Sequence, residues 1–466
     1  MSFEFINNSN LNDDATRKRI RRHAAVGRNR GKRISRPSRK DVLTTATTPF
    51  RVPLVVQGAS EAKEKVYHIE RPVDDGLFFP GILPGESKGL VKEVISFISS
   101  LRFSPELNNG LDYGGLRVPE CVRYMFVDEA CFHSTMSTAL LYLDNMAKKP
   151  RGKLQAMRHA SHTFRLLKQK LCGQDAITDS TIAAVVSMAQ YEHNQNHIKQ
   201  GLVHVQGLWQ IAQLRGGISN LIRSPSGLGQ KMLRVDLEYS LQLGSPTLFR
   251  LEEAEMGCKS MSQFPSVCLE LDHEVHPLVL GHHSFNELPA DFRGFLVDVL
   301  FLASSLNNAI ASVAPKMSAI DLYQNIILFG YRLVKLKPLG LPLGTPSFQN
   351  RLHLGLTAFL ATFLQGWDNE IAQNDLLSQS ILAEVQTLSS AGQENQETLL
   401  WLLFIGAASS CLWKHPVWVS TAKHTLQALK IESWEDVKKI LTDFPWVNAV
   451  HDTAGQALWY RSQSLN

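Results

Sequence analysis

Lysine and arginine side chains are concentrated near the start of this 466-residue chain, at a density that could neutralise a row of phosphates. Twelve of them lie within residues 16–40, a segment without aspartate or glutamate. They are Arg17, Lys18, Arg19, Arg21, Arg22, Arg28, Arg30, Lys32, Arg33, Arg36, Arg39 and Lys40. Of 48 basic residues in all, 36 remain elsewhere against 43 acidic residues, so the rest of the chain is net negative. This asymmetry predicts a cationic arm on a mildly acidic body, and it favours a polyanionic partner.

The arm has two compatible functional interpretations. Residues 17–22 and 32–40 form two basic clusters about ten residues apart, the spacing of a bipartite nuclear import signal. The same side chains could contact DNA, where each phosphate contact adds about −0.9 to the slope of log affinity against log salt. A solvated tail without a role is the third interpretation. No aromatic residue follows Phe5 within the arm, so stacking on bases is not expected.

Histidines provide the next candidates for chemistry. His193 and His197 are four residues apart, as two zinc ligands on one helix face would be, but no glutamate lies between them. We therefore expect polar residues at a helix end. A second group could bind a metal in an irregular segment, although surface loop histidines are more common. It comprises Asp272, His273, His276, His282 and His283. No metal site and no cofactor is predicted.

Other motifs give little support for an enzyme. The six cysteines (Cys121, Cys131, Cys172, Cys258, Cys268 and Cys411) include no C-x-x-C half-site for zinc, and reduced thiols are expected. Arg215-Gly216-Gly217 follows a predicted helix rather than preceding one, which favours a helix C-cap over an anion-binding loop. Neither a P-loop nor a G-x-G-x-x-G fingerprint occurs. An enzyme with a helical fold is the least favoured class.

Helical spacing of apolar residues dominates the rest of the chain and predicts an all-α fold, a large helical-bundle domain over 89–466. Residues 1–45 are expected to form a disordered basic arm and 46–88 a linker.

Expected inward faces of the helices include Phe164, Leu167 and Leu171, and then Val203, Leu208, Ile211 and Leu214. Asp179 or Ser180 is expected to cap a helix. Residues 217–228 are expected to form a turn-rich connection. Residues 244–289 are expected to form a long loop region with short helical pieces at most. One long helix or a pair of helices is expected over 119–146, and a helix that contains 182–189 follows the Asp179 or Ser180 cap. Further helices are expected at 90–101, 157–171, 197–215, from about 229 to 243, and at 291–313, 320–336, 349–366, 376–389, 395–412, 417–428 and 434–444.

No segment is expected to enter a membrane. The longest apolar run, 399–413, is shorter than the roughly 20 residues that a bilayer requires, and it is expected to be a buried helix. The polar and basic start of the sequence does not resemble a secretory signal. We expect an intracellular protein, located in the nucleus if the arm acts as an import signal.

Several segments resemble the fungal-specific transcription factor domain, in the branch called the second fungal transcription factor family. In the arm these are Phe3-Glu4-Phe5-Ile6-Asn7, the run 16–25 and Gly31-Lys32-Arg33. In the body they are 204–208, 214–218, Asp236-Leu237 with 245–249, 400–406, 433–437 and 444–447. The resemblance covers most of 1–40 and 90–460, and it implies a helical regulatory domain and a metabolic or secondary-metabolite gene programme.

The chain departs from this family at one point. Many members carry a six-cysteine, two-zinc cluster that reads DNA bases, whereas this chain has no cysteine before Cys121. Contact with DNA would therefore be limited to phosphates. The expected partners are DNA through the arm, a nuclear import receptor, and a second copy or transcriptional partners through the helical domain. The alternative is a nuclear interaction or scaffold protein that regulates through partners without touching DNA.

Overall fold

The structure is a computed structural model that describes 91, 94, 105–114, 120–147, 153–224, 226–258, 283–341, 348–364, 374–386, 393–409 and 416–464. The chain divides into two units, Met1–Ile69 and Glu70–Asn466, and all described residues belong to the second. The predicted arm and linker, and with them the helix expected at 90–101 apart from its residues 91 and 94, lie outside the described residues.

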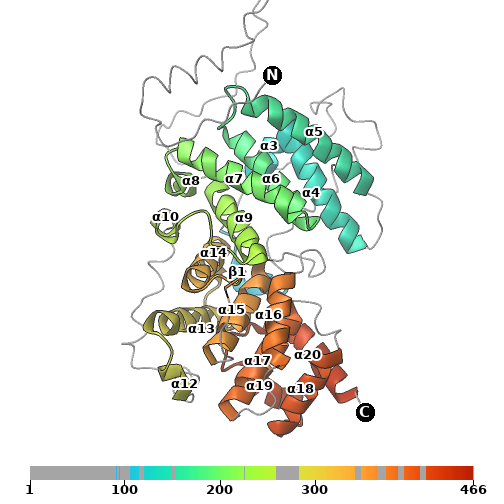
Figure 1. Cartoon of the computed structure of the whole chain (residues 1–466), viewed down its shortest axis with the longest axis vertical. Helices are drawn as coiled ribbons and strands as arrows, with labels where there is room; N and C mark the ends of the chain where they lie inside the picture. Colours follow the sequence, from blue (N-terminus) through green and yellow to red (C-terminus); the bar gives the residue numbers. More distant parts are fainter. Residues whose placement is uncertain are drawn as a thin grey trace, which may run out of the picture. The chain divides into compact units, whose positions relative to one another are not determined.

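Helices make up nearly all of the described second unit, which confirms the all-α prediction (Figure 1). Two-residue strands β1 (Leu111–Asp112) and β2 (Met317–Ser318) form a short parallel pair. The helices before the gap at 259–282 are η2 (Pro105–Gly110), α3 (Glu120–Met125), α4 (Glu129–Ala147), α5 (Lys153–Leu171), α6 (Asp179–Asn194), α7 (Ile198–Leu214), α8 (Ile218–Arg223), α9 (Leu228–Leu243) and α10 (Leu251–Gly257). Those after it are α12 (His283–Asn286), α13 (Ala290–Ile310), α14 (Ala319–Leu336), α15 (Phe348–Leu364), α16 (Asp375–Gln386), α17 (Gln393–Ser409), α18 (Pro416–Ala428), α19 (Trp434–Leu441) and α20 (Asn448–Ser464).

α14 illustrates why these sequences are helical. Ser318 is its N-cap and accepts a hydrogen bond from the Asp321 N–H, which satisfies one of the free donors of the first turn. Leu322, Ile326 and Phe329 follow at spacings of four and three and are buried. The helix ends at Leu336 because Pro338 cannot continue it.

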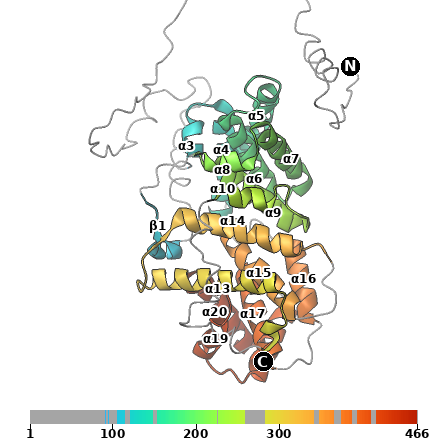
Figure 2. The same ribbon diagram turned by 90° about the vertical axis from the view of Figure 1, so that its left-hand side faces the viewer.

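Neighbouring helices bury one continuous apolar core. α4 packs on α5 and α6, α6 packs on α7 and α9, and α9 packs on α14. α14 also contacts α13 along its side (Figure 2) and packs on α15. α15 packs on α17, and α17 packs on α20. Of the apolar run 399–413, residues 399–409 are buried within α17, as predicted, and 410–413 lie outside the described residues. Trp401, Trp418 and Trp446 are fully buried. Among the described helices, none is long and apolar enough to cross a membrane.

Two predicted inward faces are partly wrong. Phe164 and Leu171 on α5 are 37% and 48% exposed, and Val203 and Leu214 on α7 are 64% and 72% exposed. The buried face of α5 consists of Ala156, Ala160, Thr163 and Leu167, and that of α7 includes Gly201 and Ala212. Leu167, Leu208 and Ile211 are buried as predicted, and small side chains, which allow close helix approach, occupy most of the other buried positions.

Two helices and one cap also differ from the predictions. α8 occupies the expected connection, because Gly217 at φ 97° allows a new helix to begin at once and bury Ile218. α20 was not expected, since its only large apolar buried residues, Leu458 and Trp459, are adjacent, and the other buried positions, His451, Gly455 and Ser462, are polar or small. Thr178, rather than Asp179 or Ser180, caps α6 and accepts from the Thr181 N–H.

The N-terminus of α19 supports a specific prediction. Ser433 is its N-cap: it accepts a hydrogen bond from the Asp436 N–H and donates to the Asp436 carboxylate at 2.6 Å. We expect Ser433→Ala to lower the free energy of unfolding by about 1 kcal/mol, because two polar groups of the first turn lose a partner. Chemical denaturation measures this, with Ser420→Ala, at a partly exposed position inside α18, as the control; equal effects of the two changes would contradict the assignment.

Candidate functional site

The twelve basic residues of the predicted arm, from Arg17 to Lys40, lie outside the described residues, so the structure does not place them. Asp272, His273, His276 and His282 also fall outside, and His283 begins α12. Gly85-Glu86-Ser87-Lys88-Gly89 matches the G-x-S-x-G pattern of a nucleophile elbow, but it too lies outside them. The candidate residues whose geometry the structure describes are those of the helical unit.

His193 and His197 do not form a ligand pair. His193 lies inside the fold, where its ring meets the Tyr239 ring edge-on at a centroid distance of 5.4 Å. Burial lowers the pKa of His193. His197 precedes α7, and its Nδ1 lies 2.9 Å from a carboxylate oxygen of Glu192. Each imidazole thus has a separate structural role, in agreement with the helix-end interpretation.

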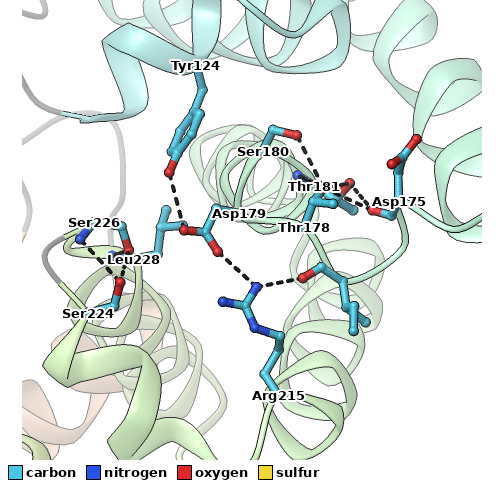
Figure 3. A network of polar contacts seen from close by, with 11 residues as sticks. Tyr124, Asp175, Thr178, Asp179, Ser180, Thr181, Arg215, Ser224, Ser226 and Leu228 are labelled. Atoms are coloured by element: carbon cyan, nitrogen blue, oxygen red, sulfur yellow. Dashed lines mark hydrogen bonds and ion pairs between the residues drawn. The ribbon is translucent and has the colours of Figure 1, made fainter. Parts of the chain in front are cut away.

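Arg215-Gly216-Gly217 is a helix C-cap, as predicted. The glycines adopt φ values of 83° and 97° just after α7, a conformation that favours glycine. The Arg215 side chain points to the start of α6 (Figure 3), where it donates to the Ile177 carbonyl at 2.7 Å and to Asp179 at 2.9 Å. The Tyr124 hydroxyl donates to the other Asp179 oxygen at 3.3 Å. This arginine links α3, α6 and α7, and its charge is already paired with a carboxylate.

A small cleft lies among α4, α6, α9 and α15. Its lining includes Tyr142, His193, Glu238 and Leu364, and its volume is about 50 Å³. Pockets for drug-sized ligands are usually about 300–1,000 Å³, so this cleft accommodates waters rather than an organic effector.

The strongest concentration of ligand-type groups lies between α4 and α5. Glu129 is the first residue of α4, and His133 follows one turn later on the same face. α5 supplies His159 and His162, which are three residues apart and also share a face. α4 and α5 pack against each other along their lengths, in part through the small residues Ala156 and Ala160 of α5, so the two faces meet.

The distances within this histidine cluster (Glu129, His133, His159 and His162) are short. One ligand atom each from Glu129, His133 and His162 lies within 4.8 Å of the others. His162 Nε2 is 2.9 Å from Glu129 Oε1, and His133 Nδ1 is 2.6 Å from His159 Nδ1. His133 Nε2 is buried and has no hydrogen-bond partner.

Burial determines the charge state of the two inner histidines. Desolvation, strengthened by the neighbouring His159, His162 and Arg165, lowers the pKa of His133 to about 3. Desolvation with the neighbouring His162 lowers the pKa of His159 to about 4. Both imidazoles are therefore neutral at pH 7, and each has a nitrogen lone pair. Neutral imidazole is the form that binds metals.

No single stretch of the sequence marks this cluster. Glu129 and His133 are separated by four residues and His159 and His162 by three, which are helical ligand spacings. Either pair alone is common on helix surfaces. The cluster becomes evident only when α4 and α5 are paired, which the sequence did not establish.

Comparison of the chain with protein-family models, with curated proteins and with solved structures found no match.

Proposed function

We propose that this protein is a nuclear regulator of transcription. Its basic arm binds a nuclear import receptor and DNA phosphates, and its helical unit carries the regulatory contacts. The observation that carries the proposal is the charge distribution, twelve basic residues within 16–40 without one carboxylate, on a chain otherwise net negative. The resemblance to the second fungal transcription factor family adds the target, a metabolic or secondary-metabolite gene programme.

The surface of the helical unit supports a role in partner binding or dimerisation. α5 exposes Leu154, Met157 and Leu171, and α7 exposes Val203 and Leu214. Phe164 of α5 stacks on His204 of α7 at a centroid distance of 5.7 Å, so the two helices are neighbours at this surface. Apolar side chains gathered on a surface often mark a protein interface.

A second function, a scaffold that acts through partners without touching DNA, is favoured by the cysteine content of residues 1–120. Since no cysteine precedes Cys121, the chain lacks the ligands of a six-cysteine cluster in its N-terminal region. Phosphate contacts alone position a protein on DNA but do not specify a sequence. Under this alternative the arm serves import only.

Replacing all twelve arm residues by glutamine, with a heterologous import signal added at the C-terminus, separates the two functions. We expect the unmodified protein to bind random duplex DNA with a log–log salt slope near −0.9 for each phosphate contacted, and the glutamine variant to lose this binding. A variant with the arm residues shuffled is the control, since non-specific charge neutralisation predicts an unchanged slope. Fluorescence anisotropy measures the slope and a reporter gene measures regulation.

The outcomes distinguish the alternatives clearly. Full regulation by the glutamine variant, once it is back in the nucleus, refutes DNA contact and supports the scaffold. Loss of regulation together with loss of DNA binding supports contact through the arm. Exclusion of the unmodified, tagged protein from the nucleus overturns both functions.

A further inference from the structure

We propose that Glu129, His133 and His162 bind one Zn²⁺ ion between α4 and α5, with His159 orienting His133. This inference is independent of the arm and of the proposed function in transcription. Two imidazole nitrogens and one carboxylate oxygen form a ligand set that zinc uses in proteins, with a fourth position left for water. Ca²⁺ and Mg²⁺ prefer oxygen ligands alone, so they fit this set poorly.

The unpartnered nitrogen of His133 is the first argument. Its Nδ1 is engaged with His159 Nδ1 at 2.6 Å, and both rings lie in the interface between α4 and α5. If His133 donates through Nδ1, its Nε2 carries a buried lone pair without a partner. A metal-bound histidine typically has this arrangement: one nitrogen binds the ion and the other donates to a second residue. A bound ion would satisfy a group that is otherwise costly to bury.

The surroundings of His162 provide the second argument. Its Nε2 lies 2.9 Å from Glu129 Oε1 and 3.0 Å from the Arg165 guanidinium. With a proton on Nε2 the ring donates to Glu129, and its Nδ1, 3.4 Å from the same Arg165 nitrogen, can accept from the arginine. The ring nitrogen Nε2 and the Glu129 carboxylate oxygen are thus already adjacent, as two ligands of one ion would be. A cation in place of the proton suits both Glu129 and His162, and exposed Arg165 can turn into solvent.

The distances allow the ion to be bound with small movements. Zinc bonds of about 2.0–2.2 Å place tetrahedral ligand atoms roughly 3.3–3.5 Å apart. One ligand atom from each of the three residues already lies within 4.8 Å of the others, and Glu129 and His162 are 33% and 31% exposed, so their side chains can adjust. The ion would tie α5 to α4, since two ligands come from one helix and the third from the other.

Zinc binding by the full-length, tag-free protein tests the site. Zn²⁺ is supplied from a chelating buffer, and bound metal is counted by mass spectrometry after dialysis. Glu129→Gln and His162→Ala, both at partly exposed positions, are expected to remove one equivalent of zinc or to weaken it at least tenfold. Exposed His424→Ala is the control and should leave binding unchanged. Because each variant is compared with the unmodified protein, zinc bound by other histidines does not affect the difference.

Two further variants separate ligation from general structure. His159→Ala should lower the affinity for zinc about 10–100-fold, as removal of an orienting partner does. Arg165→Ala should raise the affinity for zinc, since a positive charge next to the site is removed. Co²⁺ should give the intense visible absorption of a tetrahedral site in the unmodified protein and lose it in His162→Ala. An unchanged zinc stoichiometry and affinity in both Glu129→Gln and His162→Ala, with helical circular dichroism intact, would overturn the proposal.

Discussion

Asp236→Ala is expected to lower the free energy of unfolding at pH 7 by about 3 kcal/mol, because it leaves buried donors without an acceptor. Asp236 of α9 accepts hydrogen bonds from the Leu248 N–H at 2.9 Å, the Phe249 N–H at 3.1 Å and the Tyr331 hydroxyl at 2.7 Å. It therefore links α9 to α14 and to the segment after Gly244. Equilibrium unfolding in urea measures the loss.

Tyr331→Phe is the matched variant, since it removes one donor and leaves both backbone donors paired with Asp236. We expect it to cost about 1.5 kcal/mol, roughly half the cost of Asp236→Ala. Equal costs for the two variants would show that the backbone donors do not depend on Asp236, and would contradict this account of the site.

The same carboxyl gives stability a dependence on pH. Burial raises the pKa of Asp236 to about 6, against the opposing effect of its three donors. In the unfolded chain its pKa is near the ordinary value of about 4. Between these values the folded state retains a proton that the unfolded state has released, so this carboxyl makes stability fall as pH rises from about 4 to 6, with no further change above. Asp236→Ala should lack this component; if its unfolding free energy follows the same pH profile as the unmodified protein, the raised pKa is wrong.

Sequence patterns predicted the helices best where large apolar residues repeat. α14, α15 and α17 begin and end within a few residues of the expected positions, because their buried faces consist mainly of leucine, isoleucine and phenylalanine. The helix α5 was also predicted, but part of its buried face was not, and α20 was not predicted at all; their buried positions include Ala160, Gly455 and Ser462. These residues have little hydrophobicity, and only the neighbouring helix shows why they are inside.

The candidate metal site could not be predicted for a related reason. His133 and His159 are 26 residues apart, and only the pairing of α4 with α5 brings their rings together. The charge of the arm, by contrast, is a property of the sequence alone. Its prediction does not depend on the fold, and it stays a prediction.

α8 and α9 approach each other so closely that a side chain added at their contact is expected to destabilise the fold. A Cβ atom on Gly229, in the first turn of α9, would lie 2.4 Å from the Ile222 backbone nitrogen and 2.6 Å from the Leu221 carbonyl carbon. Both atoms belong to the backbone of α8, so no change of rotamer relieves the clash. We expect Gly229→Ala to lower the free energy of unfolding by at least about 2 kcal/mol, although alanine favours helix more than glycine does. Urea unfolding of the purified variant measures this.

Gly294→Ala in α13 is the control, because a Cβ atom there meets nothing within 4 Å. Alanine should stabilise that helix by about 0.5–1 kcal/mol, so the two identical changes are expected to act in opposite directions. A stabilising Gly229→Ala would mean that α8 and α9 are further apart than the structure places them. Because α8 occupies a segment whose sequence indicates only turns, this pair of variants also tests the helix that the sequence predicted least.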